Sequence, residues 1–133
     1  MYTYSSTIRL HHTDATGFIY FPNYFALATE CFESFLDTSL PLASLLKDGK
    51  LNLPVVHAVV DCKIPLSVCD PITIEMILCK SGTTSFTLGF DFKLDNGKVA
   101  ACVEIVHVAV DKKTGLPVAI PEALHALLKT IPH

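Results

Sequence analysis

The sequence contains no tryptophan and a single arginine, Arg9, and only 17% of its 133 residues are charged. The formal net charge is −3 and the chain has no basic cluster, which argues against nucleic acid as a partner. No apolar run is long enough to cross a bilayer, and the N-terminus lacks a signal-peptide pattern. We therefore expect a cytoplasmic protein that binds no membrane.

Paired cysteines and clustered metal ligands are missing as well. The 5 cysteines include no C-x-x-C pair, and most lie in apolar stretches: Cys31, Cys62, Cys69, Cys79 and Cys102. This pattern predicts reduced, buried thiols that act as small hydrophobic side chains. His11, His12 and Asp14 are close in sequence, but no matching cluster occurs elsewhere, so we predict neither a metal site nor a cofactor.

Apolar residues are abundant instead, at 50% of the chain. A chain of 133 residues can bury the core of one domain and is too short for two. We therefore predict a single domain over residues 1–133, which buries apolar surface against a partner in addition to its own core.

One long amphipathic helix is predicted from Pro22 to about residues 37–39. Its apolar positions follow the i, i+3, i+4, i+7 spacing of a helix that buries one face: Tyr24, Leu27, Ala28, Cys31, Phe32 and Phe35. Pro41 and Pro121 each mark the start of a short further helix, because proline favours the first helical position. Gly49 is expected to stop the first of these.

The remaining periodicity is that of strands. They are expected over residues 2–11, 53–64, 71–80, 83–94 and 98–111. Asp95-Asn96-Gly97 predicts a hairpin turn between the last two. A strand, a long helix and then a meander of strands indicate an α+β fold in which the sheet wraps around the helix.

The stretch from Asp14 to Tyr24 joins the first strand to the long helix. It holds a carboxylate at Asp14, a glycine at Gly17 and an apolar run before Pro22. Free backbone N–H groups at the positive end of a helix can hold a developing negative charge. The alternative is purely structural, because an Asp before a helix is commonly a turn former or cap and Gly17 can supply a positive φ.

The same stretch resembles a motif of the hot-dog fold thioesterases of the 4-hydroxybenzoyl-CoA thioesterase type. Their D-x-x-G element is matched by Asp14-Ala15-Thr16-Gly17, and their aromatic-Pro-Asn-Tyr segment by the end of Phe18-Ile19-Tyr20-Phe21-Pro22-Asn23-Tyr24. The resemblance extends over nearly the whole chain. It implies a hot-dog fold and an enzyme that hydrolyses an acyl-CoA to a free acid and a thiol, without metal or cofactor.

The resemblance also implies roles for individual residues. Asp14 either attacks the thioester carbonyl or activates a water molecule that does so. The backbone N–H of Phe21 polarises the thioester oxygen, and Gly17 belongs to the same catalytic element. The implied substrate-binding positions are Tyr20, Tyr24, His57, Lys80 and Thr84.

A phenylalanine at position 21 resembles the 1,4-dihydroxy-2-naphthoyl-CoA thioesterase branch. A bacterial branch that acts on short acyl chains has His at this position instead. The segments Leu53-Pro54-Val55-Val56-His57 and His107-Val108-Ala109-Val110 resemble two further segments of that branch. Many relatives carry an acidic residue where this chain has His12. Aromatic and aliphatic acyl groups both stay open at this point.

Other assignments also stay open on the residues alone. His57 and His107 are each either core residues with a backbone partner or residues of the acyl pocket that bond a substrate hydroxyl. His11 and Glu30 could serve a hydratase of the same fold, although Glu30 and Glu33 also fit the polar face of the helix. A non-catalytic acyl-binding module is the third hypothesis.

The carrier of the acyl group is not decided either. Relatives bind the CoA phosphates with Arg and Lys in the strand that here spans Cys79 to Phe86, where Lys80 is the only basic residue. We therefore expect either loose binding of CoA or use of an acyl carrier protein.

The last long strand is apolar on both faces from Val99 to Val110, apart from Glu104 and His107. One helix can cover only one face of the sheet, so a monomer would leave the other face in water. In the family that this chain resembles, chains pair edge to edge. We therefore predict a homodimer whose active sites are completed by the neighbouring chain, and a homotetramer built as a dimer of dimers.

Overall fold

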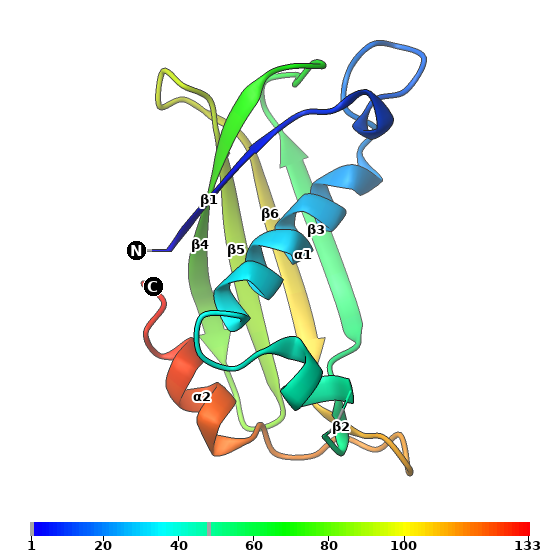
Figure 1. Ribbon diagram of the computed structural model, residues 1–133, viewed down its shortest axis with the longest axis vertical. Coiled ribbons are helices and arrows are strands. Elements are labelled where there is room, and N and C mark those ends of the chain that lie inside the picture. The colour runs from blue at the N-terminus through cyan, green and yellow to red at the C-terminus, as the bar shows by residue number, and fades with distance from the viewer. Residues whose placement is uncertain (1, 48) are drawn as a thin grey trace.

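The structure, a computed structural model, describes residues 2–47 and 49–133. Its centre is helix α1 (Pro22–Leu36), which lies against one face of a five-stranded antiparallel sheet (Figure 1). The strands follow the order β1-β4-β5-β6-β3, with bounds β1 Thr3–Thr7, β4 Pro71–Ser81, β5 Ser85–Lys93, β6 Val99–Val108 and β3 Val55–Cys62. The predicted hot-dog arrangement, a sheet wrapped around one long helix, is confirmed.

Shorter elements connect these parts: η1 Leu10–His12, η2 Ala43–Lys47, β2 Leu51–Asn52, β7 Val110–Asp111 and α2 Glu122–Leu128. β2 and β7 form a two-stranded ladder of their own. Helix α2 lies at the same end of the sheet as the turn between β4 and β5 (Figure 1), where the Ile120 N–H donates to the Thr83 carbonyl at 2.9 Å. Among the described residues, no helix combines the length and the apolar character that a membrane crossing requires.

The core lies between α1 and the sheet, as the helical and strand periodicities predict. Pro22 is the first residue of α1, and the predicted apolar stripe of the helix is buried, from Tyr24 to Leu36. The facing strands contribute alternate residues, which are fully or almost fully buried: Ile74, Met76, Leu78, Phe86, Leu88, Phe90, Phe92, Val103 and Ile105. Each such side chain contributes about 1.5–3 kcal/mol relative to an exposed one.

Four predicted strands are shorter than the sequence pattern indicated, and the one predicted over 83–94 is β5, Ser85–Lys93. The first ends at Thr7 because Leu10–His12 form a 3-10 turn, in which the Arg9 N–H donates to His12 Nδ1 at 2.8 Å. The predicted strand 53–64 begins only at Val55, after Pro54, which has no N–H to donate. The predicted strand 98–111 is divided at Ala109 into β6 and β7.

The short helix predicted after Pro41 takes the form of a π-helical turn over Ala43–Lys47. Gly49 follows it, and a Cβ at that position would lie 2.2 Å from the Leu45 carbonyl oxygen. This close approach of the backbone explains why glycine stands there.

The prediction that most thiols are buried is wrong. Cys31 alone is buried, and its burial raises the pKa of the thiol to about 12. Cys62, Cys69 and Cys79 are exposed, and Cys102 is partly exposed. The apolar neighbours of these cysteines are misleading, because Cys62 lies on an edge strand and Cys69 lies in a loop with a φ of 73°. All five thiols are free.

The two strand histidines have different environments. His107 is buried, stacks on Phe86 with 5.3 Å between ring centroids, and donates from Nδ1 to the Leu53 carbonyl at 3.0 Å. Burial lowers the pKa of His107, so the imidazole is neutral at pH 7, and the core interpretation is confirmed for this residue. It is wrong for His57, which is exposed on β3.

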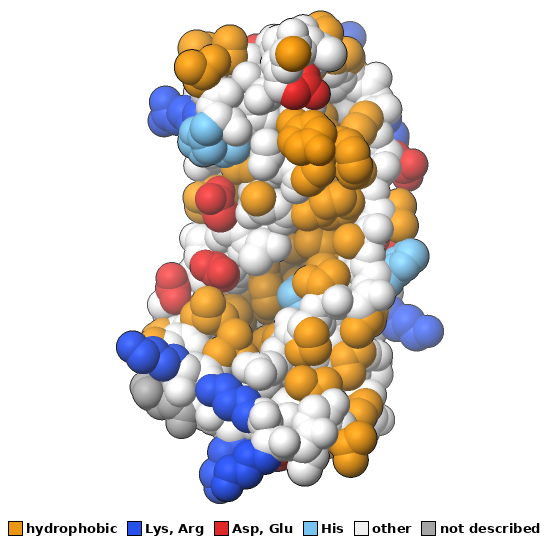
Figure 2. Space-filling model, turned by 90° about the vertical axis from the view of Figure 1, so that its right-hand side faces the viewer, with side chains coloured by type: hydrophobic (Ala, Val, Ile, Leu, Met, Phe, Trp, Pro, Cys, Tyr) orange, Lys and Arg blue, Asp and Glu red, His pale blue; other side chains and the backbone are white. Residues whose placement is uncertain are grey.

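The edge strand β3 pairs with β6 on one side only. Three of its valines are large exposed apolar residues: Val55 at 50%, Val56 at 58% and Val59 at 42%. Figure 2 shows apolar side chains running along much of this face of the molecule. A long exposed apolar edge strand offers unpaired backbone groups to another chain, which makes this edge the first candidate for a contact between chains.

Candidate active site

The predicted catalytic element forms a tight turn between η1 and α1. The Asp14 N–H donates to the Phe18 carbonyl and the Gly17 N–H donates to the Asp14 carbonyl, both at 3.1 Å. Gly17 has a φ of 86°, which glycine adopts without a steric penalty. The structural interpretation of Gly17 is therefore confirmed, because it supplies the positive φ of this turn.

The Asp14 side chain is held by Thr16. Asp14 Oδ1 accepts hydrogen bonds from the Thr16 N–H at 2.9 Å and from Thr16 Oγ1 at 2.5 Å. The hydrogen bond from the Thr16 side chain, followed by the one from its backbone, lowers the pKa of Asp14. The carboxylate is exposed and charged at neutral pH, which is the state that a nucleophile or a general base requires.

The start of α1 supplies a free donor beside this turn. Phe21 caps the helix with a φ of −55° and a ψ of −34°. The N–H groups of Asn23 and Tyr24 donate to the carbonyls of Tyr20 and Phe21, and Pro22 has none. Among the described residues, the Phe21 N–H meets no backbone acceptor. It therefore stays available to a ligand oxygen at the positive end of the helix.

The two parts of the site are tied together through the His12 carbonyl. This oxygen accepts hydrogen bonds from the Tyr20 N–H at 2.9 Å and from the Asn23 side-chain amide at 2.8 Å. Asn23 of the aromatic-Pro-Asn-Tyr segment thus fixes the helix start against the chain that precedes Asp14. The His12 imidazole points elsewhere, because its Nδ1 accepts the Arg9 N–H.

A pocket of about 250 Å3 opens beside this helix start. Its lining is aromatic or apolar except for Lys63, and the other residues are Phe18, Ile19, Phe21, Tyr24, Cys62 and Pro65. Tyr24 is buried with its ring against Phe92, at 5.3 Å between centroids. Burial is the main cause of the raised pKa of Tyr24, and the neighbouring Cys62 thiol adds to it.

Three residues of this pocket were not predicted from the sequence: Cys62, Lys63 and Pro65. Cys62 is the last residue of β3, and Lys63 and Pro65 lie in the connection from β3 to β4. The fold brings this segment to the catalytic turn, because the Ile19 N–H donates to the Leu66 carbonyl at 2.8 Å and Phe18 bridges to Ser67. No sequence pattern at either segment indicates that pairing.

The other predicted substrate-binding residues lie apart from Asp14 in the single chain. Tyr20 and Tyr24 are at the turn, but Lys80 and Thr84 are at the far end of the sheet (Figure 1). Pro71, the first residue of β4, pairs with Thr7 at the end of β1, so this end of β4 lies toward the turn that carries Asp14. β4 has 11 residues and spans roughly 33 Å at about 3.3 Å per residue.

His57 is also distant from the pocket. It precedes Cys62 by five positions on β3, a separation of roughly 16 Å along the strand. Residues that pair directly across two strands point to the same face of the sheet. His57 pairs with Val106, whereas Ile105, which is buried against the core, pairs with Ala58. His57 therefore lies on the face of the sheet that points away from α1.

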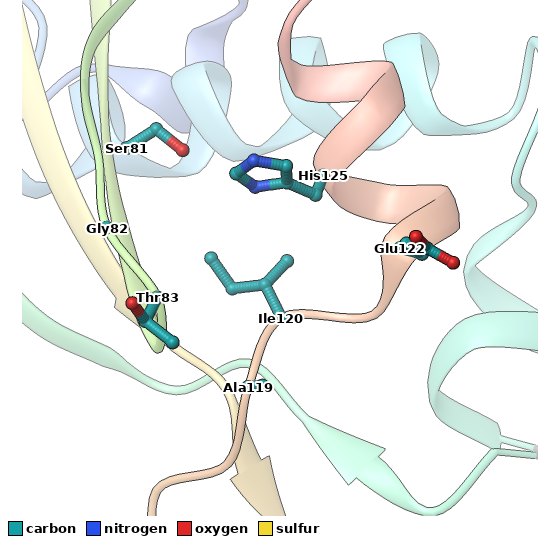
Figure 3. Close-up of a pocket in the computed structure, with 7 residues that line it drawn as sticks. All are labelled: Ser81, Gly82, Thr83, Ala119, Ile120, Glu122 and His125. Carbon is teal, nitrogen blue, oxygen red and sulfur yellow. The ribbon is translucent and has the colours of Figure 1, made fainter.

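A second pocket of about 450 Å3 lies at the far end, beside Lys80 and Thr84. It is lined by Ser81, Gly82, Thr83, Ala119, Ile120, Glu122 and His125 (Figure 3). The His125 ring points into this pocket next to Ile120, and the Glu122 carboxylate points away from it (Figure 3). The pocket at the predicted catalytic turn and the pocket at the β4–β5 turn share no lining residue and are separate in the single chain.

Residues 8–128 match the family model of the thioesterase-like superfamily. The chain belongs to this superfamily. It is 31% identical over 133 residues to a 1,4-dihydroxy-2-naphthoyl-CoA hydrolase from Rippkaea orientalis, covering 98% of this chain and 96% of the relative. The predicted family and the predicted enzyme class, an acyl-CoA thioesterase, are confirmed.

Solved structures agree with this membership. A 1,4-dihydroxy-2-naphthoyl-CoA thioesterase from Synechocystis has the same fold, with a TM-score of 0.90, 22% identity and coverage of 99% of this chain and 98% of that one. A gentisyl-coenzyme A thioesterase superposes with a TM-score of 0.83 and 27% identity, covering 92% of this chain and 98% of that one.

Proposed function

We propose that this thioesterase hydrolyses an aromatic acyl-CoA, such as 1,4-dihydroxy-2-naphthoyl-CoA or 4-hydroxybenzoyl-CoA, with Asp14 and the Phe21 N–H as its catalytic groups. One observation carries the proposal: an ionised carboxylate and an unused helix N–H lie at the two ends of one short segment. The side chains of the same segment, Phe18 and Phe21, line an aromatic pocket together with Tyr24.

The chemistry follows from that arrangement. The thioester oxygen accepts the Phe21 N–H, and the helix end stabilises the negative charge that forms on it. Asp14 then either attacks the carbonyl carbon, giving an anhydride that water hydrolyses, or takes a proton from an attacking water molecule. The C–S bond breaks and the thiolate leaves without a strong general acid, because a thiolate is a good leaving group.

The aromatic class of substrate is supported by the pocket and by the relatives. The relatives at 31% and 27% identity are a 1,4-dihydroxy-2-naphthoyl-CoA hydrolase and a gentisyl-coenzyme A thioesterase, and both acyl groups are aromatic. Ring stacking on Phe18, Phe21 or Tyr24 favours a flat acyl group by about 0.5–1.5 kcal/mol for each good contact.

A thiol-release assay over a panel of acyl-CoA substrates tests this function. We expect kcat/KM for naphthoyl- and benzoyl-type thioesters to exceed that for hexanoyl- and palmitoyl-CoA by roughly tenfold or more. Higher values for aliphatic thioesters would overturn the aromatic class. If no substrate releases a thiol, the proposed hydrolysis is wrong and the non-catalytic acyl-binding module becomes the favoured hypothesis.

A second candidate carrier is an acyl carrier protein. Lys80 is the only basic residue between Cys79 and Phe86, so the segment around the β4–β5 turn itself offers few charges for the CoA phosphates. The same acyl group presented on CoA and on an acyl carrier protein separates the two carriers, since a higher kcat/KM on the protein carrier would identify it as the substrate.

The assembly predicted from the sequence is proposed here as well. We propose that two chains pair along β3, whose valines are exposed, and that dimers associate through the sheet face that bears Val106 and Val108. This face is only half-buried, and α1 packs on the other one. Pairing would bring His57, Lys80 or Thr84 of one chain toward the catalytic turn of another, which the single chain does not do.

Val56→Lys is expected to convert the assembly to monomers and to remove most of the activity, because a lysine buried within a paired edge strand is costly. Light scattering at micromolar concentration should show two or four times the chain mass of 14.5 kDa for the natural chain. Leu116→Lys is the matched control, since Leu116 is 64% exposed and lies off this edge. A fully active natural monomer would contradict the shared site.

A further inference from the structure

The turn that carries Asp14 contains a side chain to which the mechanism has not assigned a role. Thr16 Oγ1 donates to Asp14 Oδ1 at 2.5 Å and accepts the Phe18 N–H at 3.3 Å. The Thr16 N–H donates to the same carboxylate oxygen at 2.9 Å. Two groups of Thr16 therefore hold one carboxylate oxygen, and the Phe18 N–H in turn holds the Thr16 hydroxyl.

The two oxygens of the Asp14 carboxylate therefore differ in the hydrogen bonds that they accept. Oδ1 has two donors, and among the described residues no protein donor reaches Oδ2. A carboxylate oxygen that already accepts two hydrogen bonds is a poorer nucleophile and base than a free one. The free oxygen Oδ2 is thus the atom left to act on a thioester or on a water molecule.

We infer that Thr16 is the positioning residue of Asp14: its hydroxyl locks the carboxylate to the turn and leaves Oδ2 as the reacting oxygen. This inference rests on the catalytic role proposed for Asp14. The Thr16 hydroxyl donates to Asp14 Oδ1 and accepts the Phe18 N–H, so it acts through Asp14 and not on the substrate.

The same hydrogen bond sets the acid limit of the activity. The Thr16 side chain is the largest cause of the lowered pKa of Asp14, its backbone N–H is the second, and no charged side chain of the described residues is among the causes. Loss of the hydroxyl raises the pKa of Asp14. The acid limb of kcat/KM, which reports the free enzyme, then moves to higher pH.

Thr16→Val tests the inference, because valine keeps the shape of threonine and lacks the hydroxyl. We expect kcat on the plateau to fall roughly tenfold with little change in KM, and the acid limb to shift upward. Thr16→Ser should restore both properties. Thr16→Ala repeats the comparison without a β-branched side chain in case Thr16→Val folds poorly.

Thr13→Val is the matched control. Thr13 lies in the same connection, and its hydroxyl donates to the Leu10 carbonyl at 2.7 Å and not to the Asp14 carboxylate. A Thr16→Val enzyme with the same kcat and pH profile as Thr13→Val would overturn the inference. That outcome is distinct from failure of the proposed function, which would show as an active Asp14→Asn enzyme.

Discussion

Asp14→Asn is expected to lower kcat by roughly a hundredfold or more in a protein that remains folded. The asparagine side-chain oxygen can still accept the hydrogen bonds from Thr16 that hold the turn. An amide nitrogen, however, takes the place of the free carboxylate oxygen, and an amide is neither a nucleophile toward a thioester nor a base at neutral pH. KM should change little, because Asp14 is not part of the aromatic pocket.

The measurement is a thiol-release assay on the best substrate of the panel, with the thermal unfolding midpoint recorded for each variant. Asp95→Asn is the matched control, since Asp95 is also an exposed carboxylate in a turn, the one that follows β5. Near-normal turnover of Asp14→Asn would remove Asp14 from the chemistry.

Phe21→Pro is expected to have an effect of similar size, for a different reason. The substitution deletes the backbone N–H that we assign to the thioester oxygen, and loss of one such donor typically lowers kcat by about a hundredfold to a thousandfold. The backbone tolerates the change, because the φ of Phe21 is −55° and its N–H meets no backbone acceptor among the described residues.

Phe21→Ala separates the backbone from the side chain. It keeps the N–H and removes a ring that is 57% exposed at the pocket, so we expect weaker substrate binding and a kcat much closer to that of the natural enzyme. Equal kcat values for the proline and alanine variants, both folded, would show that the N–H does not stabilise the reaction.

Local pattern determined the elements of the fold. The period of the apolar residues from Tyr24 to Phe35 predicts α1, and the alternation in β5 predicts a strand with one buried face, because both depend only on neighbouring residues. The turn at Asp95-Asn96-Gly97 is also local: Gly97 has a φ of 83°. The motif from Asp14 to Tyr24, together with the chain length and the order of the strands, indicated the family and the enzyme class.

Exposure and contacts over long sequence distances were decided only by the tertiary structure. Cys62 and His57 have apolar sequence neighbours, yet both are exposed because β3 is an edge strand, and position in a sheet is not encoded in one strand. The pocket likewise needs the pairing of Phe18 with Ser67, which joins segments that share no pattern. The distance between Asp14 and Lys80 follows from the length and direction of β4 in the folded sheet, so only the fold shows that one chain alone does not unite the two.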